Sequence, residues 1–319
     1  MKATAIAHPN IALSKYWGKQ ERSGNYPATP SLSVTLSGLA TETTVEYSDS
    51  FPADSICVGG KPAGAAFAKR AEEMLSRIRT KTHTPFAKVD TSNDFPTASG
   101  LASSASGFAA LATACAAAAG LNWNQEILSD LARQSSASAA RSIYGGFVEL
   151  AADPSAELLA AKEVAPFNHM DLHVLVCVAT EDAKLYGSTE AMNLSKSGPY
   201  YRRWIDVAHE LHREVREALL AREFVRMGVA LEQSALAMHA CALSVGIAYW
   251  SDTTRNVYNV MRKLRETGTN VFCSMDAGPH VKLFVEGRDA EVVEKLARAT
   301  PGVLRTIHAR PAMGARVLP

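Results

Sequence analysis

Phe95-Pro-Thr-Ala-Ser-Gly-Leu-Ala-Ser-Ser-Ala-Ser-Gly107 is the stretch of this sequence that says most about its fold. It starts with a turn signal, contains two glycines and five hydroxyl side chains, and continues into an alanine-rich apolar segment from 108 to 120. This order predicts a small-residue loop that leads into a helix. The first backbone N–H groups of a helix have no intrahelical partner and lie at the positive end of its dipole, so they favour an anion.

Two interpretations of this loop remain open on its residues alone. Glycines and serines let the backbone close around phosphate oxygens without collision, which favours a nucleotide-binding loop. The same small residues also suit a core helix with closely packed neighbours. The Gly-Lys-Ser/Thr ending of a Walker A loop is absent, so that class of nucleotide site is disfavoured.

Length and composition indicate a globular protein of one large or two ordinary domains. The chain has 319 residues, of which 47% are hydrophobic and 20% charged. The formal net charge of +1, without a long basic run, argues against nucleic acid or a membrane surface as the main partner. No apolar run approaches the ~20 residues that span a bilayer, and the N-terminus is too polar for a signal peptide.

The cysteines point to a reducing compartment. There are five of them, an odd number, widely spread and without a CxxC pair. This pattern predicts reduced core thiols rather than a disulfide framework or a zinc site. Together with the absence of a signal peptide, it predicts a cytoplasmic protein.

A second informative stretch runs from His8 to Lys19 and places Lys15-Tyr-Trp-Gly-Lys19 after a short apolar strand. Lysines on both sides of two large aromatic residues suggest cations that receive an anionic ligand, with Tyr16 as a hydrogen-bond donor. The alternative is an edge strand whose lysines extend along apolar surface into solvent.

A third stretch, Gln134 to Glu149, places three serines before Arg141 and a Gly-Gly break before a strand. The planar guanidinium of arginine binds carboxylate or phosphate through paired hydrogen bonds. The alternative is a structural salt bridge. With hydroxyls at Ser136 and Ser138 beside Arg141, an anion site is the favoured interpretation.

The periodicity divides the chain near residue 180. Short alternating strands and two or three helices are expected before this point, and long amphipathic helices with further strands after it. His209 and His212, on the helix predicted for 200–220, are expected to face solvent rather than to bind metal. Asp276 lies in a turn between two predicted strands, where an aspartate by default bonds its own backbone.

The motifs, taken together, resemble those of the mevalonate diphosphate decarboxylase family of the GHMP kinase superfamily. The resemblance rests on four stretches in the family's order: Asn10-Ile-Ala with Lys15-Tyr-Trp-Gly-Lys19, Phe95 to Ser104, Ser138 to Gly146, and Met275-Asp-Ala-Gly-Pro279. They span nearly the whole chain. The glycine-serine loop is shared by the wider superfamily, whereas the lysine-aromatic and Asp-Ala-Gly-Pro stretches are specific to the decarboxylase branch.

The resemblance implies an α+β fold of two lobes. Residues 1–180 would form an N-terminal lobe like domain 2 of ribosomal protein S5, and residues 181–319 a ferredoxin-like C-terminal lobe. It also implies a homodimer that uses ATP and Mg²⁺. The reaction would phosphorylate the 3-hydroxyl of mevalonate 5-diphosphate and then release phosphate and CO₂ to leave isopentenyl diphosphate.

The family motifs also imply roles for individual residues. Asp276 would contact the 3-hydroxyl, Lys15 would lie beside the transferring phosphoryl group, and Arg141 would hold the C1 carboxylate. The other substrate-binding residues would be Asn10, Tyr16, Lys19, Ser136, Ser138 and Ser188. The ATP phosphates would be bound by Ser99, Gly100, Leu101, Ala102, Ser103 and Ser104, and Ser104 would contact the magnesium held by those phosphates.

Some positions depart from the family pattern and leave alternatives open. Ala137 stands where a glycine is usual, His280 where an asparagine follows Asp-Ala-Gly-Pro, and Thr29-Pro30 where an asparagine often precedes the strand. Ser188-Thr189 occupies the place of a Ser-Arg pair found in diphosphate-specific members, so mevalonate 5-phosphate is an alternative substrate. A mevalonate 3-kinase without decarboxylation and a non-catalytic ligand sensor are further alternatives, disfavoured because Lys15, Arg141 and Asp276 are all present.

Overall fold

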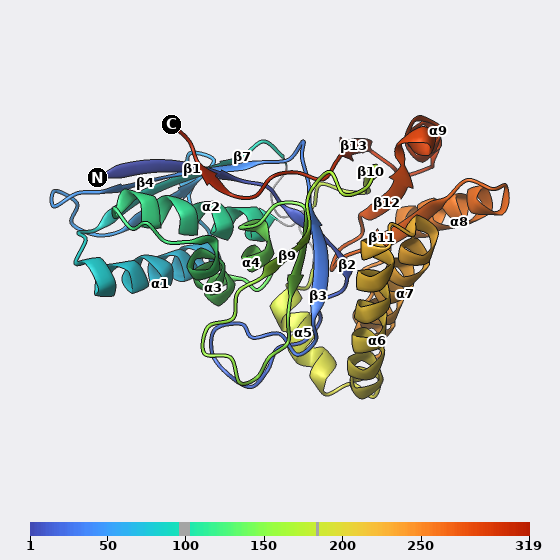
Figure 1. Cartoon of the computed structure of the whole chain (residues 1–319), viewed down its shortest axis with the longest axis horizontal. Coiled ribbons are helices and arrows are strands. Elements are labelled where there is room, and N and C mark those ends of the chain that lie inside the picture. Colours follow the sequence, from blue (N-terminus) through green and yellow to red (C-terminus); the bar gives the residue numbers. More distant parts are fainter. Residues whose placement is uncertain (96–102, 183–184) are drawn as a thin grey trace.

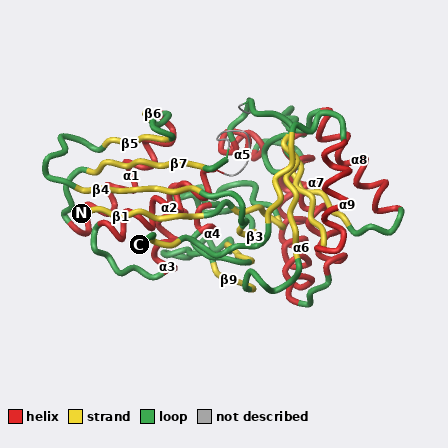
Figure 2. The backbone as a smooth tube through the Cα atoms, turned by 90° about the horizontal axis from the view of Figure 1, so that it is seen from above, coloured by secondary structure: helices red, strands yellow, loops and turns green. Residues whose placement is uncertain are grey.

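The computed structural model of the chain describes residues 1–95, 103–182 and 185–319. These residues form three β-sheets with helices on their faces, which confirms the α+β class. Figure 1 shows two lobes, one around β1, β4 and β7 and one around β10 to β13, with β2, β3 and β9 between them. Figure 2 shows the same division from above.

The first lobe is built on a six-stranded sheet in the order β14-β1-β4-β7-β5-β6. Its strands are β1 (Lys2–Ala7), β4 (Thr41–Tyr47), β5 (Ser55–Val58), β6 (Lys61–Pro62), β7 (Ala87–Asn93) and β14 (Arg316–Val317). One face is covered by α1 (Ala65–Thr82), α2 (Ser103–Ala118) and α3 (Gln125–Ser135), as Figure 1 shows. Small residues on almost every side of α2 are buried, which lets this helix lie close beneath the sheet.

A second sheet, in the order β2-β3-β8-β9, lies between the two lobes. It consists of β2 (Asn10–Ser14), β3 (Ser31–Thr35), β8 (Phe147–Leu150) and β9 (Lys162–Ala165). Its apolar side chains, such as Leu32 and Val34, join the core formed with the helices of the second lobe. The opposite face carries hydroxyl groups toward the short helix α4 (Ala139–Ser142).

The second lobe contains the sheet β11-β12-β10-β13. Its strands are β10 (Leu172–Val178), β11 (Val271–Met275), β12 (Val281–Glu286) and β13 (Arg305–Ala309). Its helices are α5 (Ser188–Lys196), α6 (Tyr201–Leu220), α7 (Phe224–Leu243), α8 (Asp252–Glu266) and α9 (Gly287–Ala299). Alternate side chains of β10, β11 and β12 face α6 and α7 on one side and α8 and α9 on the other. Strand β10 precedes residue 180, and the division of the chain at that residue stays a prediction.

The last residues of the sequence return to the first lobe and form a C-terminal strap, residues 310–318. Its backbone bonds residues of the first lobe and of the central sheet: Ala312 donates to Thr35 O, Ala315 to Ile143 O and Leu318 to Thr4 O. At Gly145 the backbones approach so closely that a Cβ would lie 2.7 Å from a backbone nitrogen of the strap. Glycine is needed there because any side chain would separate the two segments.

Most elements agree with the expectations from the sequence, but the short elements β6, α4, β9 and β14 and the burial of His212 differ from them. The short strands expected before residue 180 are observed, among them β4, β5 and β8, and Asn124 caps α3 by accepting the Ile127 N–H at 3.0 Å. β9 and β14 were not predicted, because one lies in a polar stretch and the other is two residues long. The prediction for His212 was wrong: this residue of α6 is buried, whereas His209 is exposed.

Candidate active site

Four charged side chains from separate segments lie close together where the lobes meet. Lys15 follows β2, Arg141 belongs to α4, Asp276 follows β11, and Lys282 belongs to β12. Lys15, Arg141 and Lys282 are each at most 2% exposed. Burial of three cationic side chains is costly unless anions compensate them, so this arrangement points to a binding site for an anionic molecule.

Lys15 and Asp276 form the shortest ion pair of this group. The Lys15 ammonium lies 2.6 Å from Asp276 Oδ1 and also donates to Ala12 O at 3.0 Å. Burial lowers the pKa of Lys15, and its attraction to Asp276 opposes this shift. Two of the three ammonium hydrogens are therefore directed by the protein, which fixes the position of the charge.

Asp276 lies between two lysines. Its second carboxylate oxygen, Oδ2, is 3.0 Å from the Lys282 ammonium, and about a quarter of its side chain (27%) is exposed. Burial alone would raise the pKa of Asp276, but Lys15 and Lys282 outweigh burial and hold it well below its usual range. The carboxylate is thus ionised at neutral pH and oriented at both oxygens.

Lys282 was not predicted from the sequence, although a signal was present. It is a lysine within the apolar run Val281-Lys-Leu-Phe-Val285, where a strand buried on both faces would normally carry no charge. A buried lysine in such a strand needs an anionic partner, and Asp276 lies six positions before it in the turn that precedes the strand. That pairing is what the structure shows.

The hydrogen bonds that the Arg141 side chain makes to described residues all go to neutral oxygen atoms. Its guanidinium donates to Ser31 Oγ at 2.6 Å, Ser33 Oγ at 3.0 Å and Asn10 Oδ1 at 3.3 Å. Within the described residues, no carboxylate lies within 4.0 Å of it. Burial lowers its pKa to about 10. Among the described residues, Arg141 is therefore a buried cation without a counterion, which leaves its charge available to an anionic ligand.

Asn10 connects Arg141 to the serine stretch that precedes it. Its amide donates to Ser138 O at 2.9 Å and to Ser142 Oγ at 2.8 Å, while its carbonyl accepts from Arg141. The hydroxyls of Ser136 and Ser138 are 3.1 Å apart. The structure thus brings these predicted residues together and fixes the arginine through the amide of Asn10.

Tyr16 and Lys19 follow Lys15 in the segment after β2. Burial raises the pKa of Tyr16, so its hydroxyl is a neutral donor, and it finds no hydrogen-bond partner among the described residues. The Lys19 ammonium is bound by Asn25 Oδ1 at 2.7 Å and by Thr189 Oγ1 at 3.1 Å. Both groups suit an anion, and Thr189, which stands where diphosphate-specific family members are expected to carry an arginine, accepts the bond from Lys19.

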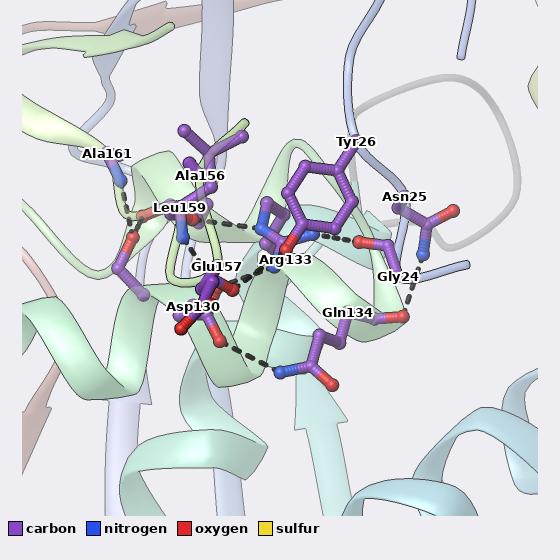
Figure 3. Close-up of polar contacts among 12 residues, drawn as sticks. Gly24, Asn25, Tyr26, Asp130, Arg133, Gln134, Ala156, Glu157, Leu159 and Ala161 are labelled. Atoms are coloured by element: carbon purple, nitrogen blue, oxygen red, sulfur yellow. Dashed lines mark hydrogen bonds and ion pairs between the residues drawn. The ribbon is translucent and has the colours of Figure 1, made fainter. Parts of the chain in front are cut away.

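The segment that carries Asn25 is fixed by a network around Arg133. Asn25 donates to Gln134 O at 2.8 Å, and Gln134 in turn donates to Asp130 Oδ2 at 2.9 Å. Figure 3 shows these contacts beside the Tyr26 ring. The network ties the loop that follows Lys19 to α3, so the position of the Lys19 ammonium depends on residues that do not themselves touch it.

The predicted ATP-binding residues are only partly described. Ser103 and Ser104 are partly buried at the start of α2, where the free N–H groups of a helix of 16 residues favour phosphate. Ser99, Gly100, Leu101 and Ala102 lie outside the described residues. Ser188 begins α5 and is partly buried.

Two family models match the chain and together cover most of it. The model for the diphosphomevalonate decarboxylase-like N-terminal domain matches residues 7–159, and the model for the mevalonate 5-diphosphate decarboxylase C-terminal domain matches residues 174–309. Lys15 and Arg141 lie within the first match, and Asp276 and Lys282 lie within the second.

Known proteins of similar sequence and structure agree with these models. Diphosphomevalonate decarboxylase mvd1 of Aspergillus fumigatus is 34% identical over 94% of this chain and 81% of its own length. The diphosphomevalonate decarboxylase of Bos taurus is 33% identical over 93% and 80%. A solved structure of MDDEF in complex with MVAPP, AMPPCP and magnesium is 34% identical, covers 100% of this chain and 99% of the other, and has a TM-score of 0.92. Mevalonate diphosphate decarboxylase from Staphylococcus aureus is 32% identical over 100% and 98%, with a TM-score of 0.93.

The fold and the site define an enzyme of the two-lobed GHMP kinase type. Within that class, the chain belongs to the diphosphomevalonate decarboxylase family. The resemblance inferred from the four sequence motifs is thereby confirmed.

Proposed function

We propose that this protein catalyses the ATP-dependent decarboxylation of mevalonate 5-diphosphate to isopentenyl diphosphate. The observation that supports this most directly is the charge of the site: three buried cations, Lys15, Lys282 and Arg141, meet the single carboxylate of Asp276. A substrate with a carboxylate at one end and a diphosphate at the other supplies the missing negative charge.

The substrate carboxylate is assigned to Arg141. Its guanidinium is buried, oriented by Ser31 and Ser33, and without an acidic partner among the described residues. The phosphate end is assigned to Tyr16, Lys19 and Ser188 with the hydroxyls of Ser136 and Ser138. A carboxylate on Arg141 places the 3-carbon of the substrate on the side of Lys15 and Asp276.

The first step transfers phosphate to the 3-hydroxyl. The hydroxyl oxygen bonds to the γ-phosphorus, the bond from that phosphorus to ADP breaks, and the hydroxyl proton passes to Asp276. Because its neighbouring lysines keep Asp276 acidic, it is a weak base, and its contribution is orientation and proton transfer concerted with phosphoryl transfer, worth about 10²–10⁴-fold. The Lys15 ammonium offsets charge on the transferring group.

The second step releases CO₂. The bond between C3 and the phosphate oxygen breaks, and the electron pair of the C1–C2 bond forms the double bond between C2 and C3. Positive charge develops at C3 while phosphate leaves. The low pKa of Asp276 lets it pass the proton on to solvent, so that it would stabilise this charge as a carboxylate, while Lys15 and Lys282 would stabilise the departing phosphate.

ATP and magnesium belong to this assignment. The described part of the ATP site, Ser103 and Ser104 at the start of α2, offers hydroxyls and helix N–H groups, which fit nucleotide phosphates. Magnesium prefers oxygen ligands and is commonly held through substrate phosphates. Ser104 would supply the protein oxygen, and the metal would neutralise phosphate charge.

The decisive experiment is product analysis of the purified protein with ATP, Mg²⁺ and either mevalonate 5-diphosphate or mevalonate 5-phosphate. We expect ADP, phosphate and CO₂ in equal amounts from the diphosphate. ADP without CO₂ would instead show a 3-kinase. Preferential turnover of the monophosphate would assign the alternative substrate, which the similarity to diphosphate decarboxylases does not favour.

Other aspects of the assignment stay predictions. No helix in the described part of the chain is long and apolar enough to cross a membrane. The homodimer and the cytoplasmic location rest on the resemblance and on the cysteine pattern. Size-exclusion chromatography with light scattering tests the first of these directly.

A further inference from the structure

The backbone at the end of β2 is irregular just before Lys15. The pairing register between β2 and β3 shifts between Ala12 and Ser14, so β2 contains a bulge. A bulge bends its strand and changes the direction of the side chains that follow it. The direction in which Lys15 points therefore depends on how firmly this bulge is held.

Two buried serine hydroxyls bind the backbone at the bulge. Ser14 Oγ accepts the Leu32 N–H at 2.8 Å, and Ser234 Oγ of α7 accepts the Lys15 N–H at 2.9 Å. Both serines are at most 1% exposed. A buried N–H without an acceptor is costly, so each serine replaces a contact that the regular strand ladder would have supplied.

Ser14 is itself held by a chain of side chains that leads to α6 and β8. Its hydroxyl lies 2.9 Å from His212 Nδ1, and His212 Nε2 lies 2.7 Å from Glu149 Oε1. Arg216 approaches the same carboxylate oxygen at 3.5 Å. Every group is satisfied when His212 is neutral, donates from Nε2 to Glu149 and accepts the Ser14 hydroxyl proton at Nδ1.

Ser14, His212 and Glu149 have the residue types of a hydrolytic triad, but their geometry excludes that role. Ser14 is 1% exposed, and its oxygen already accepts a backbone N–H. A nucleophile must be open to its substrate. The chain of hydrogen bonds therefore has a positional purpose: it connects the bulge to a long helix of the second lobe.

We infer that Ser14, His212, Glu149 and Ser234 are positioning residues that hold the bulge and thereby aim the Lys15 ammonium at Asp276. The inference rests on the proposed function, in which Lys15 acts on the transferring phosphoryl group. The Lys15 ammonium contacts Asp276 at 2.6 Å and Ala12 O at 3.0 Å, and Ala12 borders the bulge. A displacement of about 1 Å of a reacting group can cost about 10²-fold in rate.

The first test compares Ser14→Ala and His212→Ala with the wild type by steady-state kinetics. We expect kcat to fall about 10-fold while KM for ATP and for mevalonate 5-diphosphate stays within about 2-fold, because neither side chain contacts a substrate. His209→Ala is the matched control: it removes an exposed histidine from the same helix, and kcat should not change. Unchanged kcat in folded Ser14→Ala, or a rise in KM alone, would overturn the inference.

Rescue separates positioning from a general loss of stability. In His212→Asn the amide lies near the former Nδ1 and can still bond Ser14, whereas the contact with Glu149 is lost. We expect this variant to recover kcat to within about 3-fold of wild type. Equal kcat in the asparagine and alanine variants would contradict the proposed order of contacts.

Amide hydrogen exchange tests the same contacts without any assay of turnover. Ser14→Ala should accelerate exchange at Leu32, and Ser234→Ala should accelerate it at Lys15, each about 10-fold, with exchange in β4 unchanged as an internal control. Unchanged exchange at both amides would overturn the inference. Failure of the proposed function has a different signature, which is absence of CO₂ release by the wild type.

Discussion

Two buried arginines, eight positions apart in the chain, are treated in opposite ways by this protein. Arg133 in α3 is surrounded by partners: it bonds Asp130 at 2.5 Å, Leu159 O at 2.9 Å and Gly24 O, and it lies 3.9 Å from the centre of the Tyr26 ring (Figure 3). Its charge is compensated by the carboxylate of Asp130 and by backbone carbonyls, which is typical of an arginine with a structural role.

Arg141 is equally buried, yet the described residues that its side chain hydrogen-bonds, Ser31, Ser33 and Asn10, are all neutral. Within the described residues it forms no ion pair. The difference shows that burial alone does not identify a functional arginine. What identifies it is a buried charge whose compensating anion is left for a ligand to supply.

The largest effect is expected for Arg141→Met. Loss of a bidentate contact to the substrate carboxylate removes about 3–6 kcal/mol of binding in the transition state, or roughly 10²–10⁴-fold in kcat/KM. The free energy of unfolding should change by less than ~1 kcal/mol, because no internal ion pair is broken. Steady-state kinetics and urea unfolding measure the two quantities. A large loss of stability with little loss of kcat/KM would show that Arg141, like Arg133, has a structural role.

Arg133→Met should show the complementary pattern. Asp130 would lose its partner, and the carbonyls of Gly24 and Leu159 would lose a donor, so the free energy of unfolding should fall by about 3–5 kcal/mol. Urea unfolding measures this change. Below the unfolding transition, kcat should fall far less than in Arg141→Met. If both variants lose kcat/KM equally, the distinction between the two arginines is wrong.

The two arginines also show what sequence reasoning can and cannot find. Arg141 was predicted because the serines beside it mark an anion site in the sequence itself. The structural role of Arg133 was not predicted, because its partners Gly24 and Leu159 are distant in the chain and contribute only carbonyl groups, which carry no sequence signal.

The difference between contacts of distant segments and local patterns also explains which other features could be predicted from the sequence. Ser31 and Ser33 lie in a predicted strand, but only its pairing with β8 places them under Arg141. The periodic helices α6 and α8 were predictable because apolar spacing is local information. The bulge before Lys15 was not, because it depends on the register between two strands.

Asp276, the acidic residue of the site, should make the stability of the folded protein depend on pH in acidic solution. Its pKa in the folded protein lies below the value near ~3.9 of the unfolded chain, so between these values the unfolded state binds more protons. Its stabilising contribution is complete above about pH 5 and is lost as the pH falls through the pKa of the unfolded chain towards that of the folded protein. Between pH 5 and 3 the wild type should therefore lose stability more steeply than Asp276→Asn, by at most ~1.4 kcal/mol per pH unit.

Urea unfolding of both proteins at several pH values measures this difference. At neutral pH, Asp276→Asn should also lose turnover by orders of magnitude while ATP binding persists. Parallel stability curves for the two proteins would show that the lysines do not hold the carboxylate ionised. Near-normal turnover of the variant would remove Asp276 from the proposed mechanism.

The smallest effect is expected for Arg22→Ala. Arg22 is exposed, and its guanidinium lies 3.6 Å from the centre of the Tyr26 ring. The buried Arg133 contacts the same ring. An exposed contact of this kind contributes about 0.5–1 kcal/mol. Thermal or urea unfolding should show a loss in this range with unchanged kcat/KM. A loss as large as that of Arg133→Met would mean that exposure does not weaken the contact.

The C-terminal strap has a consequence for the synthesis of the protein. Because β14 pairs with β1, and residues 310–318 supply hydrogen bonds to Thr4, Thr35 and Ile143, the sheet that starts the sequence is finished only by residues near 318. The second lobe is complete in sequence before the first one is. During synthesis on the ribosome, the β1 edge of the first lobe therefore stays unpaired until residues 310–318 have emerged.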